Sequence, residues 1–246
     1  MNFIRKTFKS SHPKQDEMFY NEVKSILGFS PKSLLYYKKA FTHRSLKKLD
    51  EIGNPNNYER LEFLGDAMLD AVIASYLFKK APSGNEGYLT QMRSKIVSRE
   101  HLNELGRDLN LIRLVKSNVS KSKFGENING NIFEALIGAI YLDRGYKYCK
   151  KFVYSNVIKP YVDLPKLEGK VTSYKSIFIE WCQKEKKHFE FEVYEDTGND
   201  TIRHFSVKLH LEDKIIAKGR STSKKKAEEI AAKRGYFANQ TEISKK

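Results

Sequence analysis

The spacing of apolar residues changes about two thirds of the way along this chain, and that change restricts the possible folds more than any other feature. Up to about residue 160, apolar residues recur every three or four positions, and no alternating pattern occurs. Residues 160–170 contain two prolines, an aspartate and a glycine, which interrupt the periodicity. Beyond them, one more helical segment precedes stretches that alternate. The sequence therefore predicts an all-α N-terminal domain followed by a small α+β domain.

The same patterns assign the individual elements. In the N-terminal part, helices are predicted over residues 15–27, 33–40, 58–78, 86–97, 99–109, 130–143 and 146–157. In the C-terminal part, an α-β-β-β-α order is predicted, with helices over 173–186 and 223–238 and strands over 189–194, 205–211 and 215–217. We expect a basic arm over residues 1–14, a helical domain over 15–160, a linker over 161–171 and the α+β domain over 172–240.

The charge balance indicates a polyanionic partner. The formal net charge is +15, which suits RNA, DNA or an anionic membrane surface, because Lys and Arg placed near phosphates release condensed counterions. No apolar run approaches the roughly 20 residues of a membrane span, and the basic N-terminus lacks the apolar centre of a secretion signal. Cys149 and Cys182 are too few for a disulfide framework or a zinc site. We therefore expect a cytoplasmic protein in a reducing compartment.

Three acids share one face of the predicted helix over residues 58–78. Glu59, Glu62 and Asp66 are three and four positions apart, so their carboxylates project from the same side. Like charges at this spacing repel, and either solvent or a bound divalent cation can offset the repulsion. The apolar residues between and after them, which are Leu61, Phe63, Leu64, Met68 and Leu69, are expected to be buried. The acids should therefore border a buried surface.

A second helix repeats this combination of acid and small residues. Gly65 lies inside the first helix, where a glycine costs roughly 1 kcal/mol and usually allows another backbone to approach. In the second helix Asn131 and Glu134 share a face, and Gly138 again permits close packing. If the two helices pack together, oxygen atoms from both could meet and bind Mg²⁺ or Mn²⁺. The alternative is an ordinary pair of amphipathic helices with solvated acids.

The segment ERLEFLGDA at residues 59–67 closely resembles the signature of the ribonuclease III family. The resemblance extends to THRS at residues 42–45 and FEALIGA at residues 133–139, in the same order and with the same spacing. It implies an all-helical, dimeric nuclease domain that cuts double-stranded RNA with divalent metal and no other cofactor. The implied products carry 5′-phosphate and 3′-hydroxyl ends, and the implied role is the processing of ribosomal and other RNA. His43 lies outside the acid cluster and is interpreted as structural, with Thr42 and Ser45.

The resemblance also implies roles for the acids. Glu62, Asp66 and Glu134 are expected to be catalytic and to bind the metal. Glu59 is expected to contact RNA or water near the site. Glu86 resembles an acid that the family contributes from the neighbouring subunit.

Asn131 departs from the family, which usually has aspartate at this position. An amide oxygen can coordinate a metal but brings no charge, so we expect Asn131 to be a fourth, weaker ligand. The mild consequence is a loss of metal affinity of roughly 10- to 100-fold. The severe consequence is a catalytically silent scaffold that binds double-stranded RNA. We favour an active enzyme, because Glu62, Asp66 and Glu134 are all present.

The C-terminal part resembles the double-stranded RNA-binding domain. Its last helix begins with consecutive lysines, and its first helix carries polar residues on one face. The residues expected to contact RNA are Ser176, Glu180, Gln183, Thr201, Ser223, Lys224, Lys225 and Lys226. Ser221 and Thr201 depart from the common pattern, where glycine and histidine are frequent. Such domains recognise the shape of A-form RNA. This context disfavours another reading, a basic regulator that reads DNA bases.

Overall fold

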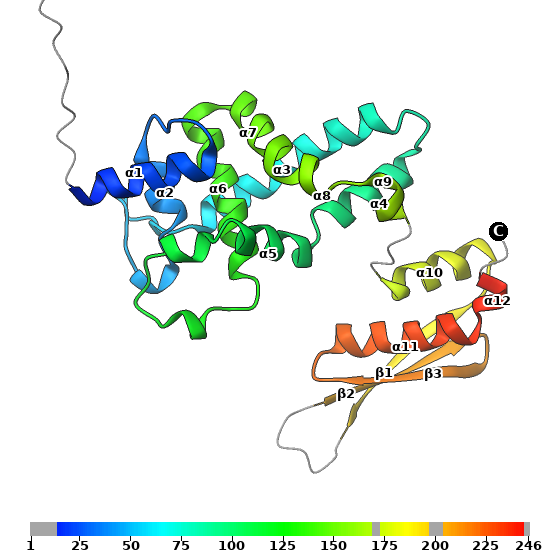
Figure 1. The fold of residues 1–246 in the computed structure, drawn as a ribbon. Helices are drawn as coiled ribbons and strands as arrows, with labels where there is room; N and C mark the ends of the chain where they lie inside the picture. Colours follow the sequence, from blue (N-terminus) through cyan, green and yellow to red (C-terminus); the bar gives the residue numbers. More distant parts are fainter. Residues whose placement is uncertain (1–13, 169–172, 197–203, 244–246) are drawn as a thin grey trace, which may run out of the picture. The chain divides into compact units, whose positions relative to one another are not determined.

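The computed structural model describes residues 14–168, 173–196 and 204–243, and the chain divides into two compact units, residues 1–168 and 169–246 (Figure 1). Most of the predicted N-terminal arm, residues 169–171 of the predicted linker, and Thr201 lie outside the described residues.

The first unit is built from helices. Its α-helices are α1 (Lys14–Leu27), α2 (Leu34–Ala40), α3 (Glu59–Lys80), α4 (Glu86–Ile96), α5 (Arg99–Asp108), α6 (Ile128–Arg144), α7 (Tyr146–Val153), α8 (Lys159–Tyr161) and α9 (Leu164–Glu168). Short 3₁₀ segments lie at Arg44–Leu46, Leu111–Leu114 and Lys121–Lys123, and a π-helical segment, Tyr154–Ile158, joins α7 to α8. Apart from two isolated bridges, the described part of this unit contains no β-structure, which confirms the all-α prediction.

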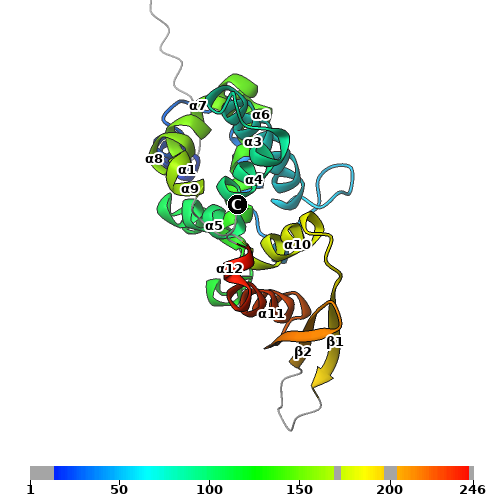
Figure 2. The same cartoon turned by 90° about the vertical axis from the view of Figure 1, so that its right-hand side faces the viewer.

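Helix α6 is the centre of the first unit. It packs against α2, α3, α5 and α7, and Figure 1 shows it among them; Figure 2 gives the same helices turned by 90°. Most of its apolar residues, including Ile132, Phe133 and Ile137, are fully buried. Because α6 is apolar on nearly every side, it can only be stable as the middle helix of a bundle. A polar group on the inner part of α6 is therefore largely desolvated, and Glu134 is in that position.

Two side-chain caps fix the starts of α4 and α5, which begin at the predicted residues. Asn85 accepts a hydrogen bond from the Tyr88 backbone N–H at 2.9 Å, and Ser98 accepts one from His101 at 3.4 Å. Such caps satisfy backbone donors that the helix itself leaves without partners. Each cap also fixes the residue at which its helix begins, and α5 begins at Arg99.

The predicted linker over residues 161–171 differs from the structure, which has the short helix α9 within it. Helix α9 belongs to the first unit and packs on α4. The buried Lys95 ammonium donates to the backbone carbonyls of Leu167 and Glu168, at 2.8 and 3.2 Å. The sequence pattern missed α9 because its stabilisation comes from this distant lysine and not from its own periodicity.

The second unit is a three-stranded sheet with helices. Its elements are α10 (Tyr174–Lys184), β1 (Phe189–Asp196), β2 (His204–Leu211), β3 (Lys214–Ser221), α11 (Lys224–Ala238) and α12 (Gln240–Ile243). The strands pair antiparallel in the order β1-β2-β3, with Val193 opposite Val207 and Val207 opposite Gly219. The core contains Phe178, Trp181, Cys182, Val207, Leu209, Ala227 and Ala231. This arrangement confirms the predicted α-β-β-β-α domain, with a longer third strand than the apolar residues alone predicted.

Candidate active site

Helices α3 and α6 approach so closely that their backbones touch at glycines. A Cβ atom on Gly65 would lie 1.7 Å from the carbonyl oxygen of Glu134, and one on Gly138 would lie 2.3 Å from that of Leu61. No side chain can occupy either place, so both glycines are required by the packing itself. This confirms the predicted close approach at Gly65. The contact places the acidic face of α3 beside the one acid that α6 buries.

The predicted acids of the two helices open onto one cavity. Glu62, Asp66 and Glu134 line a space of about 420 Å³, together with Glu59, Phe63 and Arg99. Asp66 and Glu59 are exposed, and Glu62 is half-buried. The structure therefore brings together all the acids that the sequence assigned to α3 and α6.

Glu134 is the acid whose charge is least well solvated. Its exposed fraction is only 7%, since α6 is buried. Burial, and after it the nearby charges of Asp66 and Glu62, raise the pKa of its carboxyl to about 7, with Arg99 partly opposing the rise. The pKa of Glu62 is also raised, mainly by burial, with Arg99 again opposing. A positive charge brought into this cavity would favour the ionised form of both acids.

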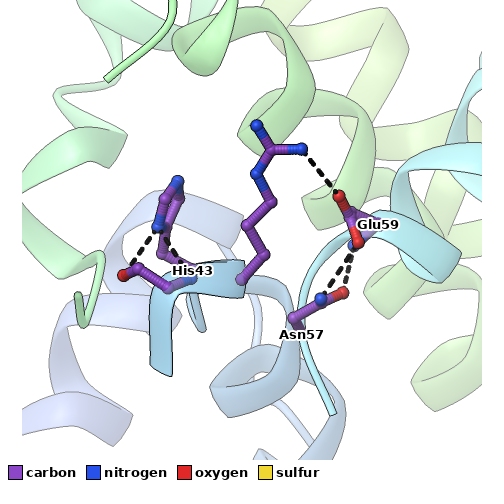
Figure 3. A network of polar contacts seen from close by, with 5 residues as sticks. His43, Asn57 and Glu59 are labelled. Atoms are coloured by element: carbon purple, nitrogen blue, oxygen red, sulfur yellow. Dashed lines mark hydrogen bonds and ion pairs between the residues drawn. The ribbon is translucent and has the colours of Figure 1, made fainter. Parts of the chain in front are cut away.

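Glu59 is held by neighbours that the sequence did not single out (Figure 3). The Asn57 amide donates to its carboxylate at 3.0 Å, and the Asn57 carbonyl oxygen accepts from the Glu59 backbone N–H at 3.0 Å. Arg44 forms an ion pair with Glu59 at 3.5 Å. These contacts orient the Glu59 carboxylate at the start of α3.

Asn131 is not among the residues that line the cavity, but it contacts Arg99, which does line it. The Arg99 guanidinium donates to the Asn131 Oδ1 atom at 3.3 Å. Burial raises the pKa of the nearby Tyr58 hydroxyl, and Asn131 acts on that pKa in the opposite direction. The oxygen that the sequence assigned to a metal thus serves as a hydrogen-bond acceptor for an arginine. Sequence reasoning missed Arg99, because a single arginine at a helix start carries no periodic signal.

The donor chemistry of the cavity fits a hard divalent cation, which prefers carboxylate and amide oxygens. In the described part of the chain, however, no group of three or more His, Cys, Asp or Glu residues is arranged to hold a metal as it stands. Carboxylates that repel one another do not close up without a cation between them. The residue types fit a metal, and the final ligand geometry would form when one binds.

Two other predicted residues lie apart from this cluster. Glu86, at the start of α4, does not line the cavity of its own chain, and its carboxylate accepts from Thr90 at 2.9 Å. His43 is buried, and its Nδ1 atom accepts from the Ser45 backbone at 3.2 Å, capping the short helix Arg44–Leu46. That capping contact confirms the structural interpretation of His43.

The second unit presents the predicted RNA-binding residues on two helices. Ser176, Glu180 and Gln183 are exposed on α10, and Lys224, Lys225 and Lys226 are exposed in the first turn of α11 after Ser223. None of the three lysines pairs with an acid among the residues that the structure describes. Cations beside the N–H groups of a helix start form a favourable place for a phosphate.

Acids on α11 fix α10 relative to the lysines. Glu229 accepts from the Ser173 hydroxyl at 2.8 Å and from the Tyr174 backbone N–H at 2.6 Å. Glu228 pairs with Lys175 at 2.6 Å. The polar face of α10 and the lysine turn of α11 are therefore held as one surface.

Comparisons with known proteins agree with both units. A family model described as ribonuclease-III-like matches residues 33–161, and one described as a double-stranded RNA binding motif matches residues 174–236. Ribonuclease 3 of Flavobacterium psychrophilum is 62% identical over 246 residues, the whole of both chains. The chain belongs to the ribonuclease III family. As a member of this family it is an endoribonuclease that acts on double-stranded RNA.

Other ribonuclease III proteins give the same result. Ribonuclease 3 of Zunongwangia profunda is 63% identical over 244 residues, covering 99% of this chain and all of the relative. The solved nuclease domain of ribonuclease III from Campylobacter jejuni, which has a region involved in dimer formation, is 30% identical with a TM-score of 0.50. It covers 57% of this chain, and 96% of that domain is matched.

One residue of the ribonuclease III signature is placed differently from the prediction. Phe63 was expected to be buried, but 80% of it is exposed. It is about half a helical turn from Leu61 and Gly65, the residues that contact α6, and its side chain borders the acidic cavity instead of packing in the core.

In the described residues no helix combines the length and apolarity needed to cross a membrane.

Proposed function

We propose that the chain cuts double-stranded RNA at the cavity between α3 and α6, using Glu62, Asp66 and Glu134 as catalytic metal ligands. The observation that carries this proposal is the backbone contact at Gly65 and Gly138, which brings acids from two helices to one cavity of about 420 Å³. Nothing in an ordinary helix pair requires a buried glutamate beside two further carboxylates. The cost of that arrangement is explained if a cation binds there.

Mg²⁺ is the proposed ion, with Mn²⁺ as a substitute, because all the donors are oxygens. A divalent cation, when bound, supplies Lewis acidity toward water and the phosphate. The residues of the chain hold the acids in place: α6 fixes Glu134, and Asn57 and Arg44 orient Glu59 toward RNA or water at the rim. Asn131 is the proposed fourth oxygen donor, and its two lone pairs allow it to keep the bond from Arg99.

The second unit is proposed to hold the duplex. Ser176, Glu180 and Gln183 would face one minor groove, and the exposed lysines of α11 would meet phosphates across the major groove. Ser223 and Thr201 complete the predicted set, the latter outside the described residues.

The nuclease domain is proposed over residues 15–160 and the RNA-binding domain over 172–240. The substrates would be structured precursors, including ribosomal RNA, and the products would carry 5′-phosphate and 3′-hydroxyl ends.

A homodimer is the proposed assembly, and Phe63 is its anchor. The exposed Phe63 stands beside a largely apolar cavity of about 670 Å³, whose lining includes Tyr36, Leu61, Leu64 and Leu142. An apolar ring next to an apolar hollow is self-complementary when a second copy is turned by a two-fold axis. Such a dimer also provides a route by which Glu86 could act at the partner's site, as predicted.

The dimer is tested by Phe63→Ala with Phe78→Ala as its control. Both phenylalanines lie on α3, and their exposed fractions are similar, 80% and 72%. Analytical ultracentrifugation should give a dimer for the parent and for Phe78→Ala and a monomer for Phe63→Ala at micromolar concentration. If Phe63→Ala remains dimeric with an unchanged dissociation constant, this interface is wrong.

A cytoplasmic location belongs to the same proposal. Cys149 and Cys182 are both unpaired and buried, which suits a reducing compartment.

Cleavage of a long RNA duplex tests the activity. Full-length parent, Glu134→Gln and the exposed control Glu104→Gln are incubated with Mg²⁺ or Mn²⁺, and duplex binding is measured in parallel. We expect the parent and Glu104→Gln to cut, and Glu134→Gln to lose at least about 1000-fold in rate while binding persists. If the parent and Asn131→Asp both bind but never cut at any metal concentration, the RNA-binding scaffold is the correct reading.

A further inference from the structure

Arg99 is the cationic side chain that lines the acidic cavity. Its guanidinium is the largest charge opposing the raised pKa of both Glu62 and Glu134, and it donates to Asn131 at 3.3 Å. Glu59 and Asp66, exposed acids, line the same space. An arginine at this place is not needed to fill the core, because its side chain is exposed.

The hydrogen-bond partner of Arg99 is neutral, so no carboxylate holds its guanidinium directly. Among the described residues Arg99 forms no ion pair within 4 Å, and its one hydrogen bond goes to an uncharged amide. A guanidinium has five N–H donors in a planar fork that fits two oxygens of a phosphate. With aspartate at position 131 the fork would instead be held by a carboxylate. Asn131 therefore positions the guanidinium without neutralising it.

We propose that Arg99 is a catalytic residue that donates hydrogen bonds to the non-bridging oxygens of the scissile phosphate, with Asn131 as its positioning residue. The proposal rests on the cleavage function assigned above and adds a substrate contact to that site. An RNA phosphate approaching four acids meets strong repulsion, and a fixed cation among them offsets part of it. The guanidinium is permanently charged, so its contribution does not depend on the concentration of metal.

The role of Arg99 in the reaction is electrostatic. The oxygen of a water molecule forms a bond to phosphorus, the bond from phosphorus to the 3′ oxygen breaks, and solvent accepts the proton of the water and supplies one to the leaving oxygen. Arg99 keeps all its protons and stabilises the negative charge that gathers on the non-bridging oxygens. A metal site weakened by Asn131 would supply less positive charge near the phosphate. The Arg99 guanidinium supplies part of that charge.

The test uses single-turnover cleavage of a duplex by the full-length chain at saturating metal and saturating enzyme. Arg99→Ala and Arg99→Lys are compared with Arg107→Ala, an exposed arginine on the same helix α5. We expect Arg99→Ala to cut about 100-fold more slowly than the parent, and Arg99→Lys to cut about tenfold faster than Arg99→Ala. Arg107→Ala should cut at the parent's rate. Added guanidinium ion should partly restore Arg99→Ala and leave the parent unchanged.

Binding of Mn²⁺ to the RNA-free protein, followed by electron paramagnetic resonance, separates this proposal from its rivals. Removing a positive charge beside the acids should leave Mn²⁺ affinity unchanged or raise it. If Arg99→Ala cuts at the parent's rate once Mn²⁺ saturates, the guanidinium only competes with metal and the proposal is overturned. If Mn²⁺ affinity falls in step with the rate, Arg99 acts by holding Asn131 as a ligand, which also overturns it. A parent that never cuts would instead refute the proposed function.

Discussion

The acidic cavity of the first unit and the lysine turn of the second unit place charge on helices in opposite ways. Glu134 carries its charge inside the bundle, where burial raises its pKa to about 7. Lys224, Lys225 and Lys226 carry theirs in solvent at the start of α11. Both sites depend on a glycine that allows a close approach, Gly65 beside α6 and Gly219 beside α11. The two sites therefore both rely on close packing at a glycine, and they differ in how well water solvates their charged side chains.

The difference matches what each surface has to do. A reacting phosphate must be held at one position, and desolvated charges act strongly there because little water screens them. A duplex that is recognised by shape needs several moderate contacts, which solvated lysines provide. Substitutions in the cavity should therefore act as a unit, whereas substitutions in the lysine turn should act separately and by small amounts.

The largest effect on stability is expected for Gly65→Ala. The added methyl would lie 1.7 Å from the Glu134 carbonyl oxygen, so the two helix backbones must move apart. We expect a loss of about 3 kcal/mol or more in the free energy of unfolding, measured with urea. Gly125→Ala is the matched control, because nothing lies within 4 Å of its Cβ position, and it should change stability by less than about 0.5 kcal/mol. Equal effects of the two variants would contradict the backbone contact.

That contact shows how much of the site the sequence could predict. The spacing of Glu59, Glu62 and Asp66 and the two helical glycines are local patterns, and they indicated both the shared face and the close approach. Phe63 was placed wrongly, because hydrophobicity does not show whether an apolar side chain faces the core or the surface. Arg99 was missed, since its partner Asn131 lies 32 positions away in sequence. Contacts over such distances depend on the tertiary fold and have no local signal.

A smaller effect should appear for Glu134→Gln in the absence of metal, and it should depend on pH. The folded-state pKa of Glu134, about 7, is above its ordinary value of 4.5, so folding favours the protonated form. Stability associated with this group is present below pH 4.5 and is lost as pH rises through 7. The amide avoids that loss, so Glu134→Gln should be more stable than the parent by roughly 2 kcal/mol at pH 8 and about equal at pH 4.

Thermal unfolding in EDTA at the two pH values measures this, with exposed Glu104→Gln as the control that should follow the parent. The gain at pH 8 should disappear when saturating Mg²⁺ is added, because the cation stabilises the ionised acids of the parent. A Glu134→Gln variant that is less stable than the parent at pH 8 in EDTA would show that its carboxylate is not strained by burial.

The smallest effects are expected for single lysines of α11. Because Lys224, Lys225 and Lys226 are exposed and without acidic partners among the described residues, changing one to alanine removes a phosphate contact and little else. Each variant should bind duplex RNA a few-fold more weakly, about 1 kcal/mol, and reduce the slope of log affinity against log salt by about one. Lys79→Ala, at the far end of α3, should change neither quantity. Additive losses across the double and triple variants would show that this surface lacks the coupling expected of the cavity. A single lysine variant that abolished binding would mean that the turn is organised as tightly as the acidic site, and the contrast between the two units would fail.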